Sequence, residues 1–346
     1  MRCSFVFLLF LFAQSTLALA AMAGDYTLVT FDPQRSLGGT TVFMETIVPD
    51  HPRLVEIDMQ GEVIWEYEIP KRIVRKGKPG QGADVEWIPA TDHFLFVMPF
   101  AGVYEVNREG VIVWEYETSE ITHDADRLEN GNTLFCFGWD KTDDTQIKEI
   151  DPQGKVIWSW AVKDHLLEND RRHLGPIKRD GYSHNNSVER LPNGDTRISL
   201  RNFNMVLEVG PDGAVKWSFR ALPNGRELLN PHEPKDLPNG NILVSMHGPQ
   251  ILFEITHDGQ VVRKLRSQDI HLIRGHQVLP DGNILITDVD KIMELNPQWE
   301  VVWSISKPVQ WVEPAPPGKQ TKGAGPKGGA DPREVGFYKA VRLPPR

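Results

Sequence analysis

Short runs of alternating apolar and polar residues recur along the chain and are separated by turn-forming residues. Examples are "TRISL" (196–200) and "NILVSM" (241–246), each of which follows an "LPNG" turn. Period-two alternation bounded by Gly, Pro and Asn is typical of antiparallel strands joined by tight turns. The pattern therefore predicts an all-β chain.

A Gly-x-Val-x-Trp pattern recurs six times and divides the chain into similar units. The copies lie 40 to 59 residues apart, and each unit has room for four strands. Such a unit has the size of one β-propeller blade. The copies are "GEVIW" (61–65), "GVIVW" (110–114), "GKVIW" (154–158), "GAVKW" (213–217) and two degenerate ones, "GQVVR" (259–263) and "WEVVW" (299–303).

The two chain ends predict a closed ring. The first unit starts at its second strand, "GGTTVFME" (38–45), and "FYKAVRLPPR" (337–346) matches "NSVERLPNG" of a later unit. We expect the last strand to complete blade one, because this removes two exposed sheet edges. The expected fold is a six-bladed β-propeller of four-stranded antiparallel blades, a single domain over 24–346. Residues 161–183 form an insertion with a short helix around Asp164 to His173, and the Pro- and Gly-rich residues 313–336 form a loop.

The first twenty residues resemble a secretory signal peptide. Arg2 precedes an apolar run, and small residues suggest cleavage after Ala20 or Ala23. We therefore expect a secreted or periplasmic protein without a membrane span after cleavage. Cys136 would then be the single cysteine and could form no internal disulfide. The net charge of −9 argues against nucleic acid as a partner, and a monomer is expected.

Four histidines precede the turns of four successive units. They stand five, seven, five and three residues before the turn's leucine, and odd offsets place side chains on one face of an extended strand. The strand before the turn is the innermost strand of a blade. We therefore expect these side chains to converge on the axial channel: His123, His184, His232 and His276.

Other polar residues extend this candidate site. Arg201 and His247 occupy equivalent places after the turns of adjacent units, and Arg274 and Tyr338 share the five-residue offset. The predicted substrate contacts are Asn186, His247, Arg274, Tyr338 and Asp124. The tryptophans that end the repeats are expected in the core, and the other histidines on the surface or in turns.

Three classes of function suit a ring of histidines beside an arginine. A neutral imidazole can be the nucleophile of a group transfer, with neighbouring His and Arg side chains stabilising the developing charge. Several imidazoles could instead hold a divalent metal, although the sequence has no His-x-His pair and the histidines stand at three depths. The third class is a binding propeller without a reaction.

Several segments resemble the bacterial arylsulfate sulfotransferases, quinoprotein-like propellers that use no activated nucleotide sulfate. They are "HDADRLENGNTLF" (123–135), "DGYSHNNSVERLPNGD" (180–195) and "ISLRNFNMVLEV" (198–209). The resemblance implies transfer of a sulfuryl group from a phenolic sulfate ester to a phenol. No cofactor is predicted, and a bound metal stays open as the alternative.

The same resemblance implies roles for individual residues. His123, His184 and Arg201 would bind and stabilise the sulfuryl group. His232 is the positional match of the histidine that becomes sulfated, and His276, followed by Gln277, is the alternative.

Overall fold

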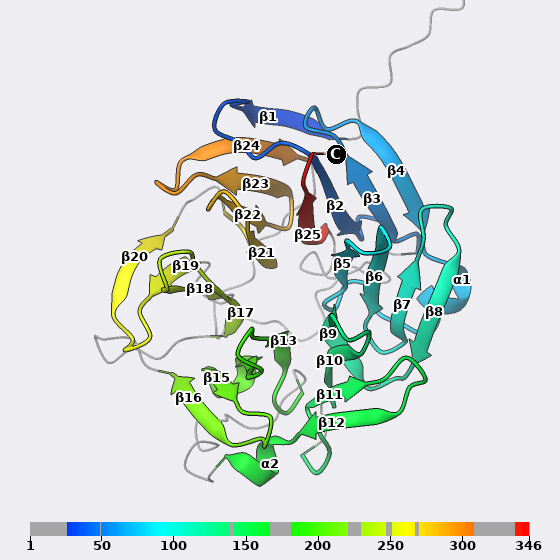
Figure 1. Cartoon of the computed structure of the whole chain (residues 1–346). Helices are drawn as coiled ribbons and strands as arrows, with labels where there is room; N and C mark the ends of the chain where they lie inside the picture. Colours follow the sequence, from blue (N-terminus) through cyan, green and yellow to red (C-terminus); the bar gives the residue numbers. More distant parts are fainter. Residues whose placement is uncertain are drawn as a thin grey trace, which may run out of the picture.

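The fold is known from a computed structural model that describes residues 26–48, 50–138, 142–166, 181–220, 230–246, 251–266, 270–307 and 336–345. Six antiparallel sheets surround a central axis, as Figure 1 shows. This confirms the predicted all-β, six-bladed propeller.

The first three blades run from their innermost to their outermost strand. Blade one consists of β25 (Phe337–Leu343), β2 (Thr40–Glu45), β3 (Arg53–Ile57) and β4 (Val63–Glu68). Blade two consists of β5 (Asp84–Ile88), β6 (His93–Met98), β7 (Gly102–Val106) and β8 (Ile112–Glu117). Blade three consists of β9 (Ile121–Arg127), β10 (Thr133–Phe137), β11 (Ile147–Ile150) and β12 (Val156–Trp160).

The last three blades follow the same order. Blade four consists of β13 (Asn185–Arg190), β14 (Thr196–Leu200), β15 (Met205–Val209) and β16 (Val215–Phe219). Blade five consists of β17 (Pro231–Asp236), β18 (Ile242–Met246), β19 (Ile251–Ile255) and β20 (Val261–Leu265). Blade six consists of β21 (Gly275–Val278), β22 (Ile284–Thr287), β23 (Lys291–Leu295), β24 (Val301–Ser306) and β1 (Thr27–Phe31).

Both ends of the chain contribute to the ring: one end forms the innermost strand of blade one, and the other forms the outermost strand of blade six. The C-terminal strand β25 pairs with β2 from Thr40↔Leu343 to Glu45↔Phe337, as the sequence predicts. The N-terminal strand β1 pairs with β24 and gives blade six a fifth strand, which the repeat pattern did not predict. Both ends of the chain therefore cover edges that would otherwise be open to pairing with another molecule.

The tryptophans of the repeats join neighbouring blades. Trp303 is fully buried, and the other four are partly buried on outermost strands and pack against the hydrophobic core, in keeping with the expected core positions. Each indole N–H donates to a backbone carbonyl of the next blade: Trp65 to Arg108, Trp114 to Pro152, Trp158 to Pro211, Trp217 to His257 and Trp303 to Met59, at 2.8–3.0 Å.

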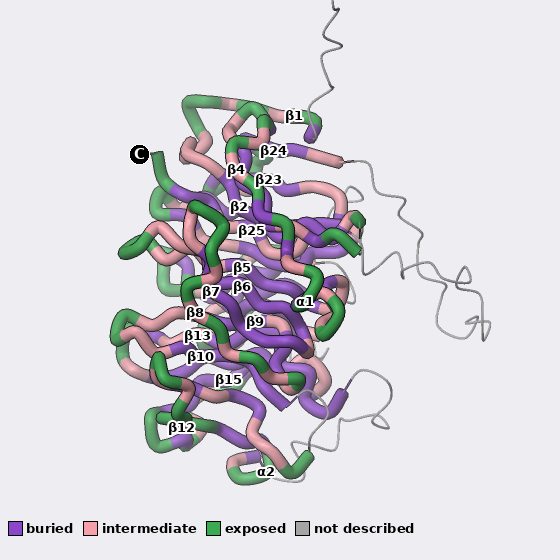
Figure 2. Tube along the Cα trace, turned by 90° about the vertical axis from the view of Figure 1, so that its right-hand side faces the viewer, coloured by how far each residue is buried: buried purple, intermediate pink, exposed green. Residues whose placement is uncertain are grey.

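The degenerate fifth copy keeps this contact with a different side chain. Arg263 replaces the tryptophan, and its Nη1 donates to the Pro297 carbonyl at 2.7 Å. The repeat motif thus conserves a donor toward the next blade around the whole ring. Figure 2 shows the outcome: buried residues dominate the inner and middle strands, and exposed residues lie at the turns and the outer strands.

A buried ion pair holds the closing strand to blade six. Arg342 on β25 lies 3.1 Å from Glu294 on β23, and both side chains are fully buried. The Arg342 guanidinium also stacks on the Trp303 ring at 4.3 Å, and burial lowers the pKa of Arg342 to about 10.

Arg342→Met is therefore expected to lower the free energy of unfolding by about 3–5 kcal/mol, because the Glu294 carboxylate stays buried without its cation. Arg35→Met is the matched control, since Arg35 is half-exposed in its pairs with Asp32 and Glu300; its expected cost is below about 1 kcal/mol. Denaturant unfolding of both variants measures the difference. Equal costs would contradict this view of the ring closure.

Little of the structure is helical. In the part of the chain that the structure describes, the helical segments are α1 (Lys71–Val74), α2 (Val162–His165) and the 3-10 turn η1 (Arg201–Phe203). Helix α2 lies at the start of the predicted insertion; the rest of the helix expected up to His173, the loop 313–335 and the predicted signal peptide lie outside the described residues. Within the described ranges, no helix has the length and apolar character to span a membrane.

Candidate functional site

The inner strands of blades three and four are irregular where they carry histidines. His123 in β9 and His184 directly before β13 have left-handed backbones, with φ of 46° and 47°. The register shifts near both residues, between Phe135 and Phe137 on β10 and at Asn186 on β13. A bulge re-aims a side chain, and a left-handed non-glycine residue costs about 1–3 kcal/mol. The orientation of both imidazoles therefore lowers the stability of the folded state.

These two imidazoles meet each other and an arginine. The His123 and His184 Nε2 atoms lie 3.2 Å apart, with ring centroids at 4.8 Å. Arg201 Nη1 lies 2.9 Å from Nδ1 and 3.0 Å from Nε2 of His184. Because one Nε2 must donate and the other accept, neutral rings with opposite proton positions suit this contact. Burial, followed by the proximity of the His232 ring and of the Arg201 cation, holds the pKa of His123 well below its usual value.

Arg201 owes its position to the 3-10 turn η1 that follows β14. The Arg201 N–H donates to the His184 carbonyl at 3.3 Å, and the Asn202 N–H donates to the Ser183 carbonyl at 3.1 Å. The backbone of η1 is therefore bonded to the segment that carries His184. This fixes the guanidinium beside the imidazole.

His232 in β17 is a neighbour of His123 and also contacts Asn186 of β13. The Asn186 amide nitrogen lies 3.2 Å from His232 Nδ1 and 3.3 Å from the Pro231 carbonyl. His232 Nδ1 also lies 2.9 Å from the Asn230 carbonyl. The shorter contact, to a carbonyl that can only accept, favours a proton on Nδ1. The Asn186 amide N–H then donates to the Pro231 carbonyl, and the ring lone pair lies on Nε2.

The charge state of His232 follows from its burial. The residue is 7% exposed. Burial, and next the positive charge of Arg201, lower the pKa of His232 to about 3. The imidazole is thus neutral at physiological pH.

His276 neighbours charged groups of blade five and lies near enough to His232 to help lower the pKa of His232. Its backbone N–H donates to Glu233 Oε2 at 2.7 Å. Burial, opposed by the Glu233 carboxylate, lowers the pKa of His276 to about 4, and Lys235 lies close enough to lower it further. The structure therefore associates His276 with charged groups of blade five and not with the His123–His184 pair.

The predicted substrate contacts fall into different places. The Arg274 guanidinium stacks on the Tyr338 ring at 3.6 Å, and the Tyr338 hydroxyl donates to the Gly80 carbonyl. Asp124 is buried, and its carboxylate accepts from the Val188 N–H at 2.7 Å and from Lys339 at 2.6 Å. His247 lies outside the described residues.

Two residues of this region were not selected from the sequence. Asn230 sets the tautomer of His232, and Lys339 binds Asp124 from the closing strand. Every residue has a backbone carbonyl, so the identity of residue 230 gives no hint of this contact, and the role of Asn230 could not be predicted from the sequence. Lys339 could have been found, because it follows Tyr338, whose register the repeats do align.

Gly82 makes room for His123. A Cβ at Gly82 would lie 2.4 Å from the His123 ring, and the Gly82 φ of 96° is unfavourable for other residues. Gly82→Ala is therefore expected to displace the imidazole, and for a reaction that uses His123 kcat/KM should fall by about 100-fold, the typical cost of misplacing a catalytic group by about 1 Å. Gly240→Ala is a control with positive φ and open space at the Cβ. Full activity in a folded Gly82→Ala protein would show that the His123 position is not required.

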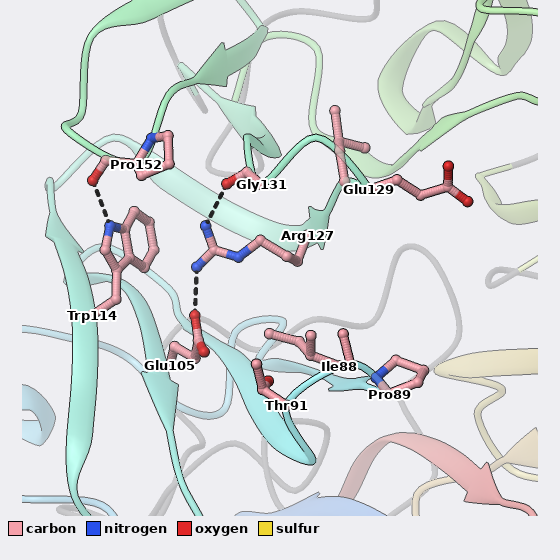
Figure 3. A pocket seen from close by; sticks show the side chains of 11 residues that line it. Ile88, Pro89, Thr91, Glu105, Trp114, Arg127, Glu129, Gly131 and Pro152 are labelled. Atoms are coloured by element: carbon pink, nitrogen blue, oxygen red, sulfur yellow. Dashed lines mark hydrogen bonds and ion pairs between the residues drawn. The ribbon is translucent and has the colours of Figure 1, made fainter.

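A groove of about 510 Å³ lies at the opposite end of β9 from His123, between blades two and three (Figure 3). Arg127 stacks on Trp114 at 4.4 Å within it. The same guanidinium donates to the Gly131 carbonyl, Thr133 Oγ1 and Glu105 Oε2 at 2.7–3.1 Å. Because these internal contacts use its donors, the groove belongs to the blade contacts and not to the histidine site.

One group of residues has ligand atoms spaced as a metal site requires. Among the described residues, His271, Asp288 and Asp290 have such atoms within 4.8 Å of one another. The Asp288 carboxylate accepts the backbone N–H groups of His271, Leu272 and Val289. Asp288 thus anchors the loops above blade six, and the group contains none of the four predicted axial histidines.

Comparisons with solved structures agree on the fold. A Bacteroides caccae protein of unknown function matches with a TM-score of 0.57 and 17% identity, over 80% of this chain and 96% of the other. A streptogramin B lyase matches with a TM-score of 0.50 and 10% identity, over 82% of this chain and 87% of the lyase. At these identities the likeness concerns architecture alone.

Comparison with curated protein sequences finds no match. The model of the Arylsulfotransferase (ASST) family matches residues 32–221, more than half of the chain. The matched segment contains His123, His184 and Arg201 and ends before His232. The chain belongs to the arylsulfotransferase family.

Proposed function

We propose that the protein transfers a sulfuryl group from an aryl sulfate to a phenol through a covalent intermediate on His232. The observation that supports this most is the tautomer of His232. Its Nδ1 faces the Asn230 carbonyl at 2.9 Å, and a proton on Nδ1 places the ring lone pair on Nε2. A neutral imidazole is the form that attacks an electrophile.

In the first step, His232 Nε2 forms a bond to sulfur while the sulfur–oxygen bond to the aromatic ring breaks. The electron pair of that bond leaves with the oxygen as a phenolate. The Nδ1 proton remains on the ring, so the modified imidazole is positively charged and the Asn230 carbonyl stabilises it. In the second step, an acceptor phenolate attacks sulfur, and the nitrogen–sulfur bond breaks to regenerate neutral His232.

Arg201, His123 and His184 would stabilise the negative charge in both steps. The Arg201 guanidinium can donate to sulfuryl oxygens, and a preorganised cation costs little reorganisation during the reaction. The imidazoles lie in contact with each other and with Arg201. An N–H of this pair can turn toward the oxygen of the leaving phenolate.

A transfer assay tests the function directly. The purified protein is incubated with a chromogenic aryl sulfate, with and without a phenol, and without any nucleotide. Acceptor-dependent phenol release, with the sulfated acceptor identified by mass spectrometry, is the expected result. Absence of release from a folded protein with a panel of aryl sulfates and phenols would refute the proposal.

The first turnover is expected to depend little on pH between 5 and 8. A histidine of ordinary pKa near 6.5 would be mostly protonated at pH 5 and would lose about 30-fold in rate. Because the pKa of His232 is lowered to about 3, the neutral form persists throughout this range. The rate of phenol release in the first turnover, without acceptor, measures this step; a loss that follows a pKa near 6.5 would contradict the assignment.

Metal catalysis at the histidines is the less favoured alternative. A guanidinium 2.9 Å from His184 would repel a divalent cation bound to that ring. Elemental analysis and the effect of a chelator on transfer distinguish the two mechanisms. We also propose that the chain is exported before it acts, which N-terminal sequencing of the secreted or periplasmic fraction would test.

A further inference from the structure

Lys339 on the closing strand binds carboxylates of three other blades. Its Nζ lies 3.1 Å from Asp84 on β5, 2.6 Å from Asp124 on β9 and 2.5 Å from Glu233 on β17. The ammonium has three hydrogens, so each can serve one carboxylate. Its side chain is 14% exposed and those of the carboxylates 5–6%. A single cation of blade one thus joins blades two, three and five.

Each carboxylate continues the connection to the next blade. Asp84 accepts the Ala125 N–H at 3.2 Å, and Asp124 accepts the Val188 N–H at 2.7 Å. Glu233 accepts the N–H of His276 itself at 2.7 Å. These N–H groups lie on β9, β13 and β21, the inner strands that carry or adjoin three of the axial histidines.

The irregular backbone positions of the site lie on inner strands as well, namely β25, β17, β9 and the residue directly before β13. Lys339 is the extra residue of a bulge in β25, and its φ is 23°. Glu233 has a φ of 44° and lies in a second bulge, in β17. His123, His184 and Asn230 are also left-handed and lie on or directly before inner strands. Such residues persist only where contacts hold them, and the Lys339 ammonium touches groups on all but one of their strands.

Charge explains why the cation matters. Asp84, Asp124 and Glu233 would repel one another if the ammonium were removed. The inner strands could relieve this repulsion by moving apart or the carboxyls by taking up protons. Movement would separate His123 from His184 and shift His232, which is adjacent to Glu233. The excess negative charge would also oppose an anionic sulfate ester.

We propose that Lys339 is the positioning residue of the transfer site, which sets the places of His123, His184 and His232 by bridging the three axial carboxylates and offsetting part of their negative charge. This inference rests on the proposed sulfuryl transfer. It adds that the C-terminal strand, which closes the ring, also determines the geometry of the reacting groups.

Lys339→Met tests the proposal, because methionine keeps the volume of the stem and removes the charge. We expect kcat/KM to fall by about 100-fold at pH 7.5, as for a misplaced catalytic group. We expect the KM of the anionic donor to rise more than that of the phenol. Activity should recover in part at pH 5, because protonation of the carboxyls removes the repulsion. A merely structural lysine would give neither the difference in KM nor the recovery.

A charge-balanced variant gives an independent test. Asp84→Asn combined with Lys339→Met removes one carboxylate with the cation, and we expect it to be at least about tenfold more active than Lys339→Met alone. Lys307→Met is the matched control, since Lys307 is 21% exposed and lies 3.3 Å from Glu45 on the outer part of the ring. Wild-type activity of folded Lys339→Met, or a loss independent of pH and without rescue, would overturn the proposal.

A readout without turnover separates this inference from the proposed function. Nitrogen-15 NMR of the histidine side chains reports the contact between His123 and His184. We expect Lys339→Met to change these signals and the second substitution to restore them, even if no sulfate ester reacts. Unchanged imidazole signals in Lys339→Met would refute the positioning role, whereas an inactive wild type with the expected NMR changes would refute only sulfuryl transfer.

Discussion

His232→Ala is expected to abolish sulfuryl transfer, with a loss in kcat of about 10⁴-fold or more, the scale seen when a nucleophile is removed. The reason is that the proposed reaction forms its nitrogen–sulfur bond at His232 Nε2, and alanine has no nucleophile in its place. The residue is buried and its ring contacts the Asn230 carbonyl, so the folded state of the variant must be checked by circular dichroism. Stopped assays with high enzyme concentrations measure the residual rate.

His276→Ala serves as the matched control for this prediction. His276 is also buried and lies on the inner strand of the next blade, but it neighbours Glu233 and Lys235. We expect a loss below about tenfold from its indirect effect on the site. Wild-type turnover in His232→Ala together with complete loss in His276→Ala would instead assign the nucleophile to His276.

Arg201→Lys is expected to lower kcat by about 10²–10³-fold, although the positive charge is retained. The guanidinium reaches both ring nitrogens of His184 at 2.9–3.0 Å and presents further N–H groups in a rigid plane. A lysine ammonium is a compact charge and cannot reproduce a planar fork with two parallel donors. The loss should appear in kcat more than in KM if the contact strengthens in the transition state.

Arg190→Lys is the control on the same blade. Arg190 pairs with Glu149 at 2.7 Å and stacks on Trp158, both toward the outer part of the ring. We expect its activity to remain within about twofold of the wild type, since it touches no group of the histidine site. Equal activity of folded Arg201→Lys and Arg190→Lys would show that Arg201 does not stabilise the reacting group.

The fold could be predicted from the sequence because the same sequence pattern recurs in each repeat. Alternation, the "LPNG" turns and the Gly-x-Val-x-Trp pattern specify local strand pairing, and the C-terminal match specifies the closure. Strand β1 could not be predicted, because the short run Thr27–Phe31 resembles no part of the repeat. Its partner β24 lies more than 270 residues away in the chain.

The candidate site could be predicted only in part. The register of the turns relates His123, His184 and His232 to one face, and the structure brings the first two into contact. The register assumes regular strands, however, and bulges at Asn186, in β17 and at Lys339 change where side chains point. The repeats align the register of Tyr338 and so could have pointed to Lys339, but the bulge that turns Lys339 toward three carboxylates leaves no clear signal in a single sequence.

The most direct test of the account is to trap the intermediate. The protein is mixed with excess aryl sulfate in the absence of a phenol acceptor, quenched, digested and analysed by mass spectrometry under conditions that preserve nitrogen–sulfur bonds. We predict one added sulfuryl group on the peptide that contains His232, lost again when a phenol is supplied before quenching. Active transfer with no sulfuryl group on His232, or with the group on another residue, would contradict the central claim.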